Sequence, residues 1–416
     1  MINGQLRVIR ELAKKYMEIA ALPKHEETRR LWRLLNARKP ERPMVSIDQV
    51  CWNEMETDGF LQTQCEDPGL RNLEYHLRMV IYKWNHFPAD MVVEPYFESP
   101  LAIDNFHGLS ERDMGFVLKE SIVKTDPTNS VVGHSFVNQL NTDGDLEVIV
   151  PAVISLNKEK TDQNYNWLNE ALDGIIPVRL AGARPNMRVW DIISTLGGVE
   201  NMMYAIADRP EFVHKIVGKM TDAHLNLLDQ MEEKKLLASY QTEIHCTGSY
   251  TDELPADGFD ANAPRAKDLW TFGLAQLFSC VSADTYSEFD FAYSNKWYKR
   301  FGLVYYGCCD PLDKKMDAVR KIPNLRKVSM SPWTNAERGA SELASDYVFS
   351  SKPNPAMLAG PTWEPEAVEK ELGGIINACK KFGSPLELIL KDVSTVKYRP
   401  ESLFEWEKIA MKLACK

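Results

Sequence analysis

The sequence predicts an α/β protein built as a (β/α)8 barrel, and three observations support this. Short runs rich in β-branched and aromatic residues alternate with longer stretches of helical periodicity. There are eight such runs, the number of strands that closes this type of barrel. The length of 416 residues suits one barrel with additions.

The eight predicted strands are separated by stretches that are compatible with helices, which is the pattern of a parallel sheet with helical connections. Pro210 and Pro365 each mark the first turn of a helix, where proline is tolerated because its missing N–H has no partner there anyway. The predicted strands are residues 44–47, 90–95, 176–180, 239–246, 303–308, 326–332, 347–353 and 386–392.

Two regions lie outside a plain barrel, which we place at residues 43–416. Residues 1–42 have helical periodicity and form an N-terminal helical extension. Residues 116–158 contain short apolar runs broken by DPTNS and NTDGD, so we expect a β-rich insertion between the second and third strands.

Composition excludes several classes of function. Hydrophobic residues make up 44% of the chain and charged residues 26%, which is typical of a globular protein. The net charge of -10 argues against nucleic acid or an anionic membrane as a partner, because both need a basic surface. No apolar run is long enough to cross a membrane, and the first twenty residues form a charged amphipathic helix rather than a signal peptide. We therefore expect a cytoplasmic protein whose eight cysteines are free thiols or metal ligands.

Candidate metal ligands lie at the ends of two predicted strands, where barrels carry their chemistry. Glu243 and His245 are two residues apart and would share one face of a strand, with Cys308 on the next strand. A carboxylate, an imidazole and a thiolate can bind zinc and leave one position open. In the alternative interpretation, His245 and Cys308 are ordinary buried residues of the barrel.

Other residues at strand ends are weaker candidates. Tyr306 and Trp333 could form an aromatic wall for a substrate, and Lys391 and Asp392 end the last strand. Cys309 should point away from Cys308, since adjacent residues of a strand face opposite ways.

Three segments resemble the uroporphyrinogen decarboxylase superfamily. They are SADTYSEFDFAYSNKWYKRFGLVYYGCCDP, WDIISTLGGVENMMYAIADRPEFVHKIVGKMTDA, and SSKPNPAML, which stands where the superfamily commonly has G-N-x-D-P. The resemblance implies the (β/α)8 fold. The M-R-Q-A-G-R-type segment of porphyrinogen decarboxylases has no counterpart in this chain.

The other branch of that superfamily comprises zinc methyltransferases that move methyl groups to or from a corrinoid. Their H-x-C pair corresponds to Tyr306-Gly307-Cys308, so Cys308 matches the family cysteine and Tyr306 replaces the histidine. The last strand offers Lys391 and Asp392 where a further cysteine would stand. GCCDP, IPNLRKVSMSPW and FSSKPNP look most like the methyltransferases of anaerobic O-demethylation systems.

The resemblance implies a zinc-dependent enzyme that moves a methyl group from a small molecule, a methoxyaromatic above all, to the Co(I) corrinoid of a partner protein. A homodimer is compatible with it. In this interpretation Tyr306, Lys391 and Asp392 are the catalytic candidates, and Trp333, Tyr306 and His245 would contact substrate. A metal-free decarboxylase and a non-catalytic binding protein are the alternatives.

Overall fold

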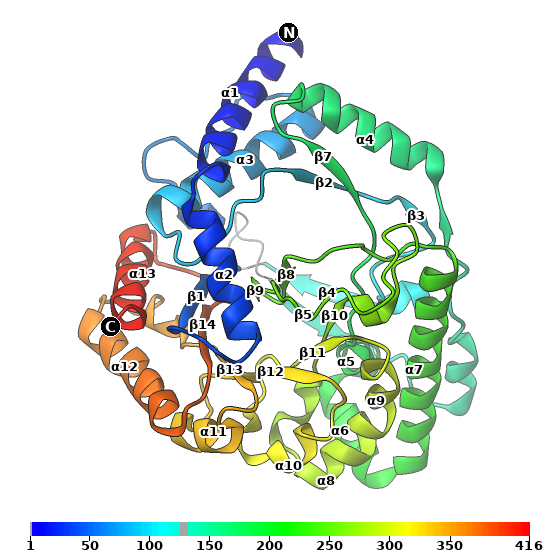
Figure 1. The fold of residues 1–416 in the computed structure, drawn as a ribbon. Helices are drawn as coiled ribbons and strands as arrows, with labels where there is room; N and C mark the ends of the chain where they lie inside the picture. Colours follow the sequence, from blue (N-terminus) through cyan, green and yellow to red (C-terminus); the bar gives the residue numbers. More distant parts are fainter. Residues whose placement is uncertain (1, 125–131) are drawn as a thin grey trace.

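The main sheet of the protein has six parallel strands. The computed structural model describes residues 2–124 and 132–416. The order of the strands is β1-β14-β13-β12-β11-β10, and helices surround the sheet on its outer side (Figure 1). The α/β class is thus confirmed. The six strands are β1 (Met44–Ile47), β10 (Trp270–Gly273), β11 (Leu303–Tyr306), β12 (Leu325–Met330), β13 (Val348–Ser351) and β14 (Leu386–Leu390).

Thirteen α-helices occur among the described residues. Two of them, α1 and α2, precede the first strand. Of all the helices in the described residues, none is both long and apolar enough to span a bilayer. Their bounds are α1 Ile2–Ala20, α2 Lys24–Asn36, α3 Pro68–His86, α4 Lys158–Leu172, α5 Val189–Gly197, α6 Val199–Asp208, α7 Pro210–Glu233, α8 Ala283–Tyr286, α9 Ala292–Tyr298, α10 Met316–Val319, α11 Ala336–Leu343, α12 Pro365–Phe382 and α13 Pro400–Ala414.

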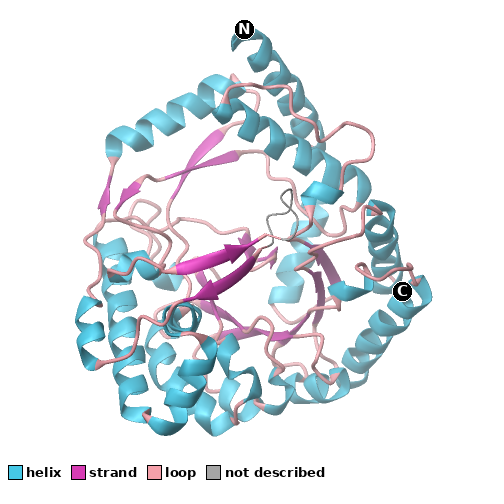
Figure 2. Cartoon of the chain, turned by 180° about the vertical axis from the view of Figure 1, so that it is seen from behind, coloured by secondary structure: helices cyan, strands magenta, loops and turns pink. Residues whose placement is uncertain are grey.

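The remaining strands form short pairs. β2 (Phe97–Pro100) and β7 (Val178–Ala181) are parallel, whereas the other three pairs are antiparallel. The β4–β5 hairpin belongs to the segment predicted as an insertion and lies in front of the ring in the view from behind (Figure 2). The antiparallel pairs are β3 (Ile103–Asp104) with β6 (Ser155–Leu156), β4 (Glu120–Val123) with β5 (Gly133–Phe136), and β8 (Glu243–Ile244) with β9 (Thr247–Gly248).

The described residues do not form one continuous eight-stranded sheet. Between β10 and β7 the connection consists of single parallel bridges, Met187 to Gly273 and Ala183 to Leu237. On the other side, the backbone N–H of Asp90 donates to the carbonyl of Val45 in β1 at 3.0 Å. The elements form a ring, and the β8–β9 hairpin lies inside it (Figure 1).

Three strand predictions need correction. Residues 90–95 form no regular strand, and β2 begins at Phe97. The predicted strand 239–246 is reduced to the two residues of β8, because His245 and Cys246 have φ angles of 42° and 69°, which extended backbone cannot contain. β10 was not predicted, since its core WTFG is short and ends in glycine.

A buried ion pair lies across the main sheet. Lys327 Nζ of β12 is 2.8 Å from Glu387 Oε2 of β14, and both side chains are completely buried. Thr247 Oγ1 in the β8–β9 hairpin donates to the same carboxylate oxygen at 2.7 Å. Lys327 Nζ also lies 3.3 Å from the carbonyl oxygen of Gly248. The pair therefore holds the hairpin against the sheet.

Removing one partner of the Lys327–Glu387 ion pair should destabilise the protein. Glu387→Gln leaves the Lys327 ammonium buried without a countercharge, so we expect a loss of about 3–5 kcal/mol in the free energy of unfolding, measured with urea. As a control, Glu369→Gln breaks a solvent-exposed pair with Lys412 and should change the free energy of unfolding by less than about 1 kcal/mol. Equal effects of the two substitutions would contradict the prediction.

Candidate functional site

Two thiols meet where β11 ends. Gly307 has a φ angle of 91°, and a Cβ atom there would lie 2.6 Å from Leu312 Cδ1, so the turn requires glycine. The chain bends, and Cys308 Sγ and Cys309 Sγ lie 3.6 Å apart. Ser329 Oγ fixes the turn by donating to the carbonyl oxygen of Cys308 at 2.8 Å. The expectation that Cys309 points away was wrong, because strand alternation ends at Gly307.

His245 lies beside the Cys308 thiol. Its ring stacks on Phe272 with centroids 3.7 Å apart and meets the edge of Tyr305 at 5.5 Å. The Nε2 atom of His245 is buried and has no hydrogen-bond partner. Burial lowers the pKa of His245, so the imidazole is held as a neutral base next to sulfur.

The two thiols differ in protonation. The hydrogen bond from Cys309 lowers the pKa of Cys308 despite its burial, and His245 adds to this effect. The same hydrogen bond, together with burial, raises the pKa of Cys309. The pair is therefore best described as a Cys308 thiolate that accepts a hydrogen bond from the Cys309 thiol.

Two lysines supply positive charge near the thiolate. Lys352 is buried at the end of β13, and its Nζ donates to Ser350 Oγ at 2.9 Å and to the Tyr305 hydroxyl. Burial lowers the pKa of Lys352 to about 8. Lys391 Nζ is 2.5 Å from Asp392 Oδ2, and although burial opposes it, the negative charge of Cys308 raises the pKa of Lys391. The predicted Lys391 and Asp392 therefore form an ion pair with each other, close to the sulfur atoms.

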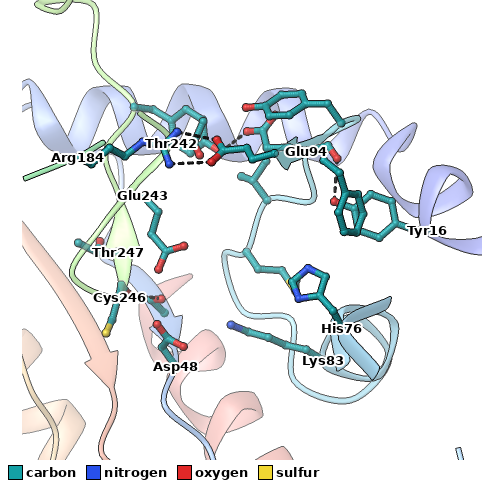
Figure 3. Close-up of a pocket in the computed structure, with 18 of the residues that line it drawn as sticks. Tyr16, Asp48, His76, Lys83, Glu94, Arg184, Thr242, Glu243, Cys246 and Thr247 are labelled. Atoms are coloured by element: carbon teal, nitrogen blue, oxygen red, sulfur yellow. Dashed lines mark hydrogen bonds and ion pairs between the residues drawn. The ribbon is translucent and has the colours of Figure 1, made fainter. Parts of the chain in front are cut away.

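The β8–β9 hairpin, whose turn contains His245, also lines a cavity of about 830 Å3. Glu243 points into it, with Asp48 close to it and with Lys83 and His76 across the space (Figure 3). Burial, and after it the charge of Asp48, raises the pKa of Glu243. Cys246 also lines the cavity, and burial raises the pKa of its thiol. Aromatic side chains line the rest of the cavity, namely Tyr16, Trp32, Tyr96, Phe97, Trp167 and Tyr250.

The predicted zinc ligands are thus only partly brought together. His245 and Cys308 are neighbours, whereas Glu243 faces the cavity on the far side of the hairpin. Within residues 2–124 and 132–416, no group of three or more His, Cys, Asp or Glu side chains is arranged to hold a metal ion.

The donor types around Cys308 nevertheless fit zinc. Two thiolates bound to one tetrahedral zinc with bonds of about 2.3 Å would lie about 3.8 Å apart, close to the 3.6 Å between Cys308 and Cys309. His245 adds an unpartnered imidazole nitrogen next to them. His245, Cys308 and Cys309 thus bring zinc-type donor atoms together without forming a complete metal site, and Glu243 is not among them.

The predicted aromatic wall is not formed. Tyr306 is completely buried, and its hydroxyl lies 2.7 Å from Asp290 Oδ2 and 2.8 Å from the Tyr286 hydroxyl, so it is a core residue rather than a catalytic one. Trp333 is 74% exposed and lines a different pocket of about 550 Å3, together with Lys314. Neither residue lines the large cavity.

Sequence reasoning missed Asp48, Lys83 and Lys352. Asp48 directly follows β1 and could have been found by its place at a strand end. Lys352 stands at a strand end in the same way. Lys83 lies on α3, and no local pattern connects it to the cavity.

Comparisons with known proteins agree with the fold. No protein-family model matches the chain, and no curated protein sequence matches it. Among solved structures, the chain is similar to a methyltransferase from Methanosarcina mazei, with a TM-score of 0.52 over 93% of this chain and 97% of that one. The sequence identity is 12%, so the likeness is evidence for a common fold.

The carboxyl group of Asp290 should make stability depend on pH. Burial raises its pKa from 3.8 to about 7, so the folded state favours the protonated form. This contribution to stability is complete below about pH 4 and is lost as the pH rises towards 7.

Asp290→Asn should therefore reduce the decrease in the free energy of unfolding between about pH 4 and pH 7, measured by urea denaturation at each pH. A part of the slope should remain, because burial also raises the pKa of Asp310, to about 6. Identical slopes for the variant and the unmodified chain would contradict this assignment.

Proposed function

We propose that this protein is a zinc-dependent methyltransferase that moves a methyl group from a methylated small molecule to the Co(I) corrinoid of a partner protein. The observation that carries the proposal is the pair of thiols at Cys308 and Cys309, with the His245 imidazole beside them. Cys246, which follows His245 in the chain, lines a cavity large enough for a small molecule. The fold likeness to a protein named as a methyltransferase supports the same conclusion.

The metal would be held by His245, Cys308 and Cys309. Zinc bound there would supply a Lewis acid for the oxygen of a methyl ether. The Lys391 and Lys352 ammonium groups would offset the negative charge of the thiolates. The ring of Phe272 orients the imidazole by stacking on it.

The lining of the cavity supports a substrate with an aromatic ring. Tyr and Trp side chains bury a flat apolar body and still offer polar edges, and six aromatic residues line this space. A methoxyaromatic donor satisfies this lining and carries the methyl group on oxygen. We also infer that the curved sheet with its single bridges is an opened form of the (β/α)8 barrel.

The cavity gives less support to decarboxylation of a polyacidic substrate. Arg184 lines it, but its guanidinium is already paired with Glu98 at 2.6 and 2.8 Å. The net charge of -10 also disfavours a polyanion.

Metal content tests the ligand set. The purified protein should hold about one zinc ion per chain, and Cys308→Ala and Cys309→Ser should each lose most of it, because each removes a thiolate donor. Glu243→Gln is the matched control and should keep its zinc, since this carboxylate faces the cavity. Zinc analysis by plasma mass spectrometry together with circular dichroism separates loss of metal from loss of fold. Stoichiometric zinc in Cys308→Ala would refute the assignment.

Methyl transfer tests the reaction. The enzyme is mixed with a reduced corrinoid and with methoxybenzoates, methoxyphenols, methylamines or methanol, and conversion of Co(I) to methyl-Co(III) is followed by absorbance. We expect turnover with methoxyaromatics. Turnover with amines or methanol alone would remove the methoxyaromatic substrate, and release of carbon dioxide from a porphyrinogen without any methyl transfer would overturn the proposal.

A further inference from the structure

One end of the large cavity carries charged groups that the protein itself does not pair. Asp48 follows β1, Glu243 belongs to the β8–β9 hairpin, and Lys83 and His76 lie on α3 (Figure 3). Among the described residues, no ion pair involves Asp48, Glu243 or Lys83. Solvent reaches Glu243 and His76 through the cavity, although protein atoms surround both side chains on most sides.

The other charged groups of the lining are already engaged. Arg184 pairs with Glu98 at 2.6 Å. Glu94 accepts from the Tyr250 hydroxyl at 2.5 Å and pairs with Arg29 at 3.0 Å. Asp90, the remaining carboxylate of the lining, pairs with Arg42 at 2.6 Å. The groups left for a ligand are therefore those of Asp48, Glu243, Lys83 and His76.

These four groups are net acidic. Two carboxylates face one ammonium group, and the Lys83 Nζ already donates to the carbonyl oxygen of Ile47 at 2.5 Å. Burial lowers the pKa of His76, so its imidazole adds no positive charge near neutral pH. A ligand carboxylate placed here would meet net repulsion, whereas a hydroxyl or ammonium group would find acceptors.

The opposite end of the cavity suits a flat apolar body. The rings of Tyr16 and Phe97 pack 5.2 Å apart. His76 lies between the two ends of the cavity, with its ring 5.3 Å from that of Phe97 (Figure 3). Trp167 also lines the cavity and is 42% exposed. One end thus offers aromatic faces and the other offers hydrogen-bond acceptors.

We propose that the cavity binds an aromatic ligand that is neutral or singly positive and bears a hydroxyl or amine group, which Glu243 and Asp48 accept, and that it rejects the corresponding carboxylate. In identifying this ligand with the methyl donor, the inference rests on the proposed function. It narrows the donor to methoxylated phenols or benzylamines and removes methoxybenzoates.

Direct binding tests this selection without any methyl transfer. Three matched probes, 3-methoxyphenol, 3-methoxybenzylamine and 3-methoxybenzoate, are titrated calorimetrically into the full-length protein in the absence of corrinoid. We expect the phenol and the amine to bind, and the benzoate to bind at least about 10-fold more weakly, as one uncompensated charge interaction of about 1.4 kcal/mol would give. Equal or tighter binding of the benzoate would overturn the inference.

Variants locate the selection in named side chains. Glu243→Gln and Asp48→Asn should each weaken binding of the amine more than binding of the phenol. Each should also reduce the factor by which the phenol and the amine bind more tightly than the benzoate. Lys83→Met should increase that factor, because it removes the ammonium group near the two carboxylates. Glu366→Gln, an exposed position on α12, is the matched control and should leave all three affinities unchanged. Unchanged affinities in both Glu243→Gln and Asp48→Asn, with the fold verified by circular dichroism, would also refute the proposal.

The two proposals can fail separately. If the probes bind as expected but no methyl group reaches the corrinoid, the proposed function fails and the selectivity of the cavity stands. If methyl transfer proceeds best with 3-methoxybenzoate, the selectivity fails and the proposed function stands.

Discussion

The buried ion pair between Lys327 and Glu387 is the constraint on which the rest of the structure depends. Two opposite charges with no exposure to water need additional hydrogen-bond partners, because their mutual attraction alone does not offset the loss of hydration. Thr247 and Gly248 supply those partners from the β8–β9 hairpin. Because this ion pair needs polar partners, the β8–β9 hairpin rather than further apolar side chains packs against it inside the ring of elements.

The position of this hairpin divides the interior into two chemical environments. His245 extends from it towards soft sulfur donors, while Glu243 extends from it towards an aqueous, aromatic-lined space. The left-handed backbone at His245 and Cys246 produces this divergence, because it reverses the direction of the chain within two residues. One short peptide segment thus joins the donors proposed for a metal to the groups proposed for a ligand.

The sequence predicted most of the main sheet and part of the site. β1, β11 and β14 were recognisable because strands buried on both faces read as largely apolar runs. β12 and β13 instead combine apolar residues with buried polar ones such as Lys327 and Ser350. Residues 239–246 alternate like a strand, but nothing in the letters His245 and Cys246 reveals a positive φ angle. Cys308 was found from its place at the end of a predicted strand, and the family resemblance then matched it to a family cysteine. The proximity of Cys309 to Cys308 depends on the turn at Gly307, which strand alternation does not reveal. The proximity of Asp48 to Glu243 joins segments about two hundred residues apart, which no local pattern encodes.

The uneven closure of the ring also determines where the protein can open. Five neighbouring strand pairs in the main sheet share ladders of several residues, with one register shift between β11 and β12. The side next to the cavity is joined by isolated bridges at Met187 and Ala183. Local opening requires less free energy where few backbone hydrogen bonds must break together. Amide hydrogens around residues 183–187 should therefore exchange with solvent faster than those of β11 to β13, and a bulky ligand could enter from this side while the sheet that carries the thiols stays intact.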